Sequence, residues 1–209
     1  KVRLFNPAAR LLQEQQWTVP LNLRARVDVV FGVEATGGAS LLAEVDPLTS
    51  WRFDDNHNID QPWAQRNLNT FCSEMPTELL VTHKTCWITR FKEFAKKRSN
   101  RFPLPANEFN AQAMIFARTA LIDTSSANEF LWIRGEKVKA SFMTFSVDIS
   151  TKTSPTNALD YMKKWDKYLA KWNAEAKESA RGAWHTSSLW VRADAQNALI
   201  SSTVLTVVI

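Results

Sequence analysis

The two cysteines limit the fold of this chain more than any other feature, because the sequence contains only this pair. Cys72 and Cys86 each lie in a short amphipathic segment, and Pro76 between them disfavours helix at the residue before it. We therefore predict two short helices, 62–75 and 85–98, joined by a bend and linked by a Cys72–Cys86 disulfide. Closing a loop of about 15 residues stabilises a fold by about 3 kcal/mol in the chain-entropy model. A nucleophilic role for Cys72 is the less favoured alternative, since it requires an activated and exposed thiolate.

Hydrophobic periodicity predicts the remaining elements. Residues 24–33 alternate and are rich in valine, which is typical of a half-buried strand, and residues 155–179 carry an apolar stripe at helical spacing. That stripe includes Ala158, Tyr161, Trp165 and Leu169 and is interpreted as a core face. The other predicted elements are a helix at 107–121, a hairpin of 130–133 with 137–149, a phase slip in its second arm near 144–147, and a final strand at 184–194.

The order of these elements is strand, helices, hairpin, long helix and strand. This order predicts an α+β fold of the ferredoxin-like βαββαβ type, with extra helices inserted in the first crossover. The segment 34–61 has no clear period and is predicted to be a long loop.

The charge pattern gives little support for a nucleic-acid partner. The net charge is only +5, and the basic run Lys96, Lys97 and Arg98 lies at the end of a predicted helix, where cations interact favourably with the helix dipole. We interpret the basic residues as a solvated surface rather than a nucleic-acid site.

No catalytic, metal or cofactor site is predicted. The three histidines, His57, His83 and His185, lie far apart, and none has a cysteine at metal-ligand spacing. The acidic residues around His57 lack the alternating oxygen ligands and central glycine of a calcium loop. The segment from His185 to Ser188 places a histidine and two serines close in sequence, but neighbouring residues of a strand point to opposite faces, so we interpret a His–Ser pairing there as accidental. Phosphate-loop, GxSxG and HExxH motifs are absent, so the chain is predicted not to be an enzyme.

The run 198–209 is apolar and uncharged. Twelve residues are too few to span a bilayer as a helix, which requires about 20 residues. The pattern alone leaves two alternatives open, a C-terminal core strand or the first part of a transmembrane helix.

Several segments in order resemble an extracellular loop of the Dispatched proteins, which belong with Patched and the bacterial resistance-nodulation-division exporters. The resemblance covers the whole chain, is strongest over 24–104, and rests on the ordered set rather than on any single motif. The segments are RVDVVFGV (26–33), FDDNHNID (53–60), QPWAQRNLNTFC (61–72), TCWITRFKEF (85–94) and FPL (102–104).

The resemblance implies a porter-type ectodomain, residues 1–197, followed by the start of a transmembrane helix at 198–209. It implies an extracellular or lumenal location at a membrane. The expected function is the handling of sterol, lipid or lipid-modified cargo by conformational change, with the rest of the transporter chain, including its other ectodomain, as partner. The alternative is an accessory structural subunit of a larger membrane-associated assembly.

Overall fold

The computed structural model describes residues 18–35 and 51–207, which form one main antiparallel sheet covered by helices. The predicted α+β class is confirmed. The strands of the main sheet are β1 (Arg24–Phe31), β4 (Val81–Thr85), β7 (Leu131–Arg134), β8 (Lys137–Ser150) and β9 (Trp184–Thr186). Their order is β4–β8–β1–β9, and β7 pairs with β8. Two small ladders lie apart from this sheet, β2 (Val33–Ala35) with β3 (Trp51–Phe53) and β5 (Leu121–Ile122) with β6 (Ser125–Ser126).

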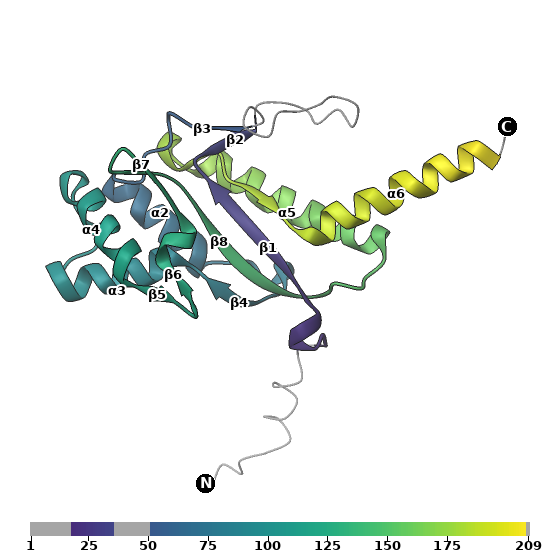
Figure 1. Ribbon diagram of the computed structural model, residues 1–209, viewed down its shortest axis with the longest axis horizontal. Coiled ribbons are helices and arrows are strands. Elements are labelled where there is room, and N and C mark those ends of the chain that lie inside the picture. Colours follow the sequence, from purple (N-terminus) through teal and green to yellow (C-terminus); the bar gives the residue numbers. More distant parts are fainter. Residues whose placement is uncertain (1–17, 36–50, 208–209) are drawn as a thin grey trace, which may run out of the picture.

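The described residues also form five α-helices. They are α2 (Pro62–Ser73), α3 (Trp87–Ser99), α4 (Ala106–Thr119), α5 (Pro155–Glu175) and α6 (Ser188–Val207). In Figure 1, α2, α3 and α4 gather beside the β4 and β7 side of the sheet, α5 lies on the β1 side, and α6 extends away from the body of the domain.

The long strand β8 organises the sheet, because it pairs with β1 along one side and with β7 and then β4 along the other. The predicted phase slip is present, but the register of the β7–β8 pair shifts earlier than expected, opposite residues 138–140. Further shifts occur near the end of β8, in its pairing with β1 and with β4. Such irregularities bend a strand and change the face to which its side chains point.

One face of the sheet carries the core. Alternate residues of β1 and β8 point inward, and they pack against the apolar sides of α2, α3 and α5 in one cluster. The stripe predicted on α5 lies in this cluster, with Ala158, Tyr161, Trp165 and Leu169 buried. The inward residues of the two strands are Ala25, Val27, Val29, Phe31, Met143, Phe145 and Val147.

The predicted bend between the two cysteine-bearing helices is wrong in one respect. The connection contains a 3-10 turn, Thr77–Leu79, and then β4, which pairs with β8 as an edge strand. The disulfide itself is present, with the two Cα atoms 6.4 Å apart. It therefore joins the end of α2 to the residue before α3, with β4 inside the loop that it closes.

The predicted final strand at 184–194 is also wrong. Only Trp184–Thr186 is a strand, and α6 begins at Ser188. The Ser187 hydroxyl accepts the Leu189 N–H at 3.2 Å, as an N-cap residue does. Leu189, Trp190 and Ala193 are then buried at helical spacing, which an alternating strand pattern does not provide.

The structure bears on the two alternatives for the apolar C-terminal run, a core strand or the first part of a transmembrane helix. Residues 198–207 continue α6, so a core strand is excluded for them. Within the described range, no helix combines the length and apolar character needed to cross a membrane. The predicted domain boundary at 197 falls inside α6 and stays a prediction.

Other predicted boundaries shift slightly. The long helix ends at Glu175 instead of 179, and the described part of the segment 34–61 contains the β2–β3 ladder. The centre of the predicted long loop, residues 36–50, lies outside the described residues.

Asp148, near the end of β8, binds the first described residues, Thr18 and Val19, through hydrogen bonds. Its carboxylate accepts the Thr18 and Val19 N–H groups, each at 2.9 Å, and Arg24 Nε lies 3.9 Å away. Burial raises the pKa of the Asp148 carboxyl, but these hydrogen bonds and the guanidinium outweigh burial, so the pKa lies below its usual value.

Replacing Asp148 with asparagine is expected to lower the free energy of unfolding by about 2 kcal/mol, because an amide offers one acceptor where the carboxylate offers two. Urea denaturation measures the change. The matched control is Asp160→Asn on exposed α5, where the ion pair with Lys163 is solvated and the expected change is below about 0.5 kcal/mol. Equal effects of the two variants would contradict this role of Asp148.

Candidate functional site

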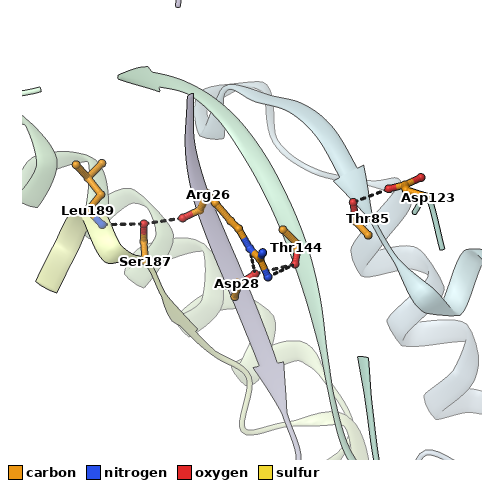
Figure 2. A network of polar contacts seen from close by, with 7 residues as sticks. All are labelled: Arg26, Asp28, Thr85, Asp123, Thr144, Ser187 and Leu189. Carbon is orange, nitrogen blue, oxygen red and sulfur yellow. Dashed lines mark hydrogen bonds and ion pairs between the residues drawn. The ribbon is translucent and has the colours of Figure 1, made fainter. Parts of the chain in front are cut away.

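The outer face of the sheet, opposite the core, carries the polar cluster that we take as the candidate site. Arg26 and Asp28 point to this face because they alternate with the buried residues of β1. Arg26 Nε donates to Asp28 Oδ1 at 2.8 Å, and Arg26 Nη2 donates to the Thr144 hydroxyl at 3.1 Å. The Thr144 hydroxyl donates in turn to Asp28 Oδ1 at 2.7 Å. Figure 2 shows the resulting closed triangle across β1 and β8.

A second cluster lies on the β4 side of the same face and centres on Asp123. This residue sits in the turn between β5 and β6 with a positive φ of 53°. Its Oδ2 accepts the Thr85 hydroxyl at 2.9 Å and lies 3.2 Å from His83 Nε2, while Oδ1 is 3.9 Å from Arg90 Nη2. Figure 2 shows Thr85 and Asp123 joined in this way.

The pKa of the Asp123 carboxyl lies below its usual value. The hydrogen bond from Thr85 is the main cause, and His83 and Arg90 contribute, while partial burial opposes the shift. The carboxylate therefore stays ionised and holds the β5–β6 turn against β4.

Two hollows of about 340 and 190 Å³ lie around these clusters, and both are lined by Thr85, Ile122 and Asp123. The larger one reaches the disulfide and Arg90, and the smaller one reaches Arg26 and Thr144. The predicted disulfide thus borders the candidate site without taking part in its polar contacts. Lys84 lies beside it, with Nζ donating to the carbonyl oxygens of Cys72 and Ser73 at 2.9 and 3.1 Å, and burial lowers the pKa of this amine.

Two tryptophans mark the two sides of this face. Trp132 on β7 is 41% exposed and Trp184 on β9 is 39% exposed. Trp132 packs on Phe142 with ring centroids 5.6 Å apart, and Trp184 Nε1 donates to the Val33 carbonyl at 2.8 Å. Aromatic side chains are enriched at protein contact surfaces.

His185 and Ser187 are close in sequence, but their side chains form hydrogen bonds with different partners. His185 Nδ1 accepts the Trp190 indole N–H at 3.1 Å, so Nε2 carries the proton directed at Asp166 Oδ1, 2.9 Å away. Burial lowers the pKa of His185, although Asp166 favours the charged form. The Ser187 hydroxyl donates to the Arg26 carbonyl at 2.6 Å, which Figure 2 shows together with its contact to Leu189. Neither residue is placed to act as a nucleophile or base.

His57 is a buried residue, only 6% exposed. Neither of its ring nitrogens has a hydrogen-bond partner within residues 18–35 and 51–207. Burial lowers its pKa to about 4, against the effect of Asp54, which favours the charged form. The ring is therefore neutral at pH 7.

The stability of the fold should depend on pH through His57. Because the folded-state pKa is lowered from 6.5 to about 4, the unfolded chain binds the proton more tightly, and stability present above about pH 6.5 is lost as the pH falls towards 4. We expect the wild type to lose about 2 kcal/mol more between pH 8 and pH 5 than His57→Leu. Urea denaturation at both pH values measures this difference. Parallel losses in the two proteins would contradict the buried neutral state.

The residues around His57 do not gather into a metal site. Asp54 Oδ1 accepts the Asn56 N–H at 2.8 Å, and Asp60 Oδ1 accepts the Gln61 side chain at 2.9 Å. In the described part of the chain, no three or more His, Cys, Asp or Glu side chains are grouped closely enough to hold a metal ion.

In sequence comparisons, no family model and no curated protein matches the chain.

The outer-face clusters were not predicted from the sequence. Arg26, Thr85, Asp123 and Thr144 come from four separate segments that only the sheet brings together. The one available signal was the placement of Arg26 and Asp28 at alternate positions of an otherwise apolar strand, which predicts that both point away from the core.

Proposed function

We propose that this chain is a porter-type ectodomain of a Dispatched- or Patched-like transporter of the resistance-nodulation-division superfamily. The observation that carries the proposal is the strand order β4–β8–β1–β9 with all neighbours antiparallel. In a ferredoxin-like βαββαβ unit the second strand lies beside the third, the third beside the first and the first beside the fourth. In this proposal β4 and β7 together correspond to the second strand, and α3 and α4, which lie between them in the chain, are the inserted helices.

The disulfide supports the extracellular or lumenal location that the proposal requires. Disulfides persist in extracellular and lumenal compartments and are rare in the reducing cytosol. Cys72 and Cys86 are both buried and bonded to each other. An ectodomain on the outer or lumenal side of a membrane fits this bond.

The connection between the sheet and α6 supports a mechanical role. The Ser187 hydroxyl bonds both the Arg26 carbonyl of β1 and the N–H of Leu189 in α6. Trp190 packs near Tyr161 of α5, with ring centroids 5.8 Å apart. If a membrane helix continues from α6, its displacement is passed directly to the sheet and to α5. Such coupling suits a domain that changes its packing during transport of lipidic cargo.

The outer face of the sheet supports the proposal that this domain packs against a partner domain. Its charged clusters are fixed by hydrogen bonds, and Trp132 and Trp184 stand beside them partly exposed. In the proposed transporter this face packs against the other ectodomain. The same surface is the one observation that favours the second candidate function, an accessory structural subunit of a membrane-associated assembly.

Cargo release in the native cell tests the transport function. The gene is deleted, and the release of a fluorescent reporter carrying covalently attached cholesterol into the medium is measured. We expect release to fall several-fold and to return when the wild-type gene is restored. Unchanged release after verified loss of the protein would contradict transport and favour the accessory subunit.

A further inference from the structure

A third cavity, separate from the two hollows of the candidate site, lies between the end of α2 and α5. It holds about 370 Å³ and is bounded by three aromatic residues, Phe71, Tyr168 and Trp172. Ligand pockets typically hold about 300–1,000 Å³. The volume therefore suits a small group such as a lipid headgroup or an osmolyte, and it is small for a whole sterol or lipid.

The aromatic residues form a continuous wall. Phe71 is buried in the core and packs on Tyr168 and Trp172, with ring centroids 5.5 and 5.0 Å away. The planes of Phe71 and Trp172 are inclined by 70°, so the rings do not lie in one plane. Tyr168 and Trp172 are half-buried at the cavity, and aromatic rings carry the negative quadrupoles that attract an organic cation.

The charges around the cavity favour a cation as well. Three carboxylates line it, Glu74, Glu78 and Glu175, against the two amines of Lys167 and Lys171. Lys171 Nζ lies 3.9 Å from Glu175 Oε1, so these two charges balance each other locally. The remaining charges sum to −1. Glu74 also contributes to the raised pKa of the Tyr168 phenol, about 12, after burial as the main cause, which places its negative charge close to the aromatic wall.

We propose that this cavity binds a quaternary ammonium group, of the kind carried by choline. A trimethylammonium ion spreads its charge over methyl groups and donates no hydrogen bonds, so it loses little by leaving water for an aromatic wall. A primary ammonium is a compact and strongly hydrated charge, so it loses more on leaving water. The group arrives either on a choline lipid at the membrane surface or on a free small molecule. The site does not depend on the transporter function.

Nuclear magnetic resonance titration of the whole chain tests the site. Tetramethylammonium chloride is the probe, with ammonium chloride and sodium acetate as comparisons. We expect saturable shifts of the Trp172 indole and Tyr168 signals with a Kd of about 1 mM, and no saturation with either comparison salt. Saturable binding of acetate, or no saturation with tetramethylammonium, would overturn the proposal.

Variants locate the binding. Glu74→Gln with Glu78→Gln removes two exposed charges without removing volume, and we expect affinity to fall about fivefold or more. The control is Glu136→Gln in the exposed β7–β8 turn, which should bind as the wild type does. Equal affinity of the double variant and the control would overturn the proposal. Because the substituted side chains are exposed, unfolding is not expected, and the circular dichroism spectrum verifies this.

Flotation with vesicles distinguishes the two sources of the ligand. Binding to phosphatidylcholine vesicles that is lost in the double variant assigns the site to a lipid headgroup. Saturable binding of tetramethylammonium without such flotation assigns it to a free quaternary amine. Either result supports a quaternary ammonium site, and neither bears on whether the protein is a transporter.

Discussion

Replacing Gly32 with alanine is expected to lower the free energy of unfolding by about 4 kcal/mol, a large part of the 5–15 kcal/mol that stabilises a typical domain. Gly32 links β1 to β2 with a φ of 79°, a left-handed conformation that costs an alanine about 1–2 kcal/mol. A Cβ atom there would lie 2.4 Å from the Lys139 carbonyl oxygen and 2.6 Å from His57 Cδ2. The carbonyl belongs to the backbone of β8, so β8 and β1 must separate to admit the methyl group.

Gly135 provides the matched control. It also has a positive φ, 58°, but a Cβ atom there would meet nothing within 4 Å. Gly135→Ala should therefore show only the conformational cost, about 1–2 kcal/mol. Chemical denaturation of the two variants separates the cost of the left-handed backbone conformation, which both share, from the cost of the steric clash, which only Gly32→Ala has. Similar losses for both would show that β1 and β8 do not approach each other at Gly32 as closely as described.

Removing the disulfide by Cys72→Ala with Cys86→Ala is expected to cost about 3 kcal/mol, because the closed loop restricts the unfolded chain. Local structure should change as well. The loop contains β4, an edge strand that pairs only with β8 in the described sheet. Without the bond, β4 is held by this ladder, by the Lys84 contacts to the end of α2 and by the Asp123 cluster.

Hydrogen exchange followed by mass spectrometry locates the effect. We expect the amides of β4 to lose protection first and those of β1 to be affected least, since β1 lies between β8 and β9. Alkylation with and without reductant verifies that the wild type has no free thiol. Two free thiols in native material, or uniform loss of protection, would contradict this role of the bond.

The parts of the fold that were predicted correctly have long and regular patterns. The stripe of α5 spans several turns, and its members Ala158, Tyr161, Trp165 and Leu169 are buried as expected. β1 was identified because its apolar residues alternate over eight positions. Both patterns follow directly from the spacing of side chains along a helix or a strand.

The elements that were missed depend on tertiary contacts. β4 has five residues, none of them buried, so its sequence carries no alternation of hydrophobicity, and only pairing with β8 makes it a strand. The start of α6 was included in the predicted strand 184–194, of which only Trp184–Thr186 is a strand. Helix formation there depends on the Ser187 cap and on burial of Trp190 against α5.

The candidate site could not be predicted for the same reason, since it also depends on tertiary contacts. The Asp123 cluster requires a two-residue ladder, β5–β6, to lie beside β4, and the residues that meet there are about 40 positions apart in sequence. The disulfide could be predicted because the chain has only two cysteines. No comparable restriction identifies which threonine or histidine meets a given aspartate.

The assignment to a transporter ectodomain is tested most directly by the size and membrane attachment of the native protein. Native membranes are washed with alkaline carbonate, and the polypeptide is detected with an antibody raised against this chain. The assignment predicts a protein much larger than 23.8 kDa that stays in the pellet and whose sequence contains several apolar spans of about 20 residues. A polypeptide near that mass, released by carbonate and without such spans, would contradict it.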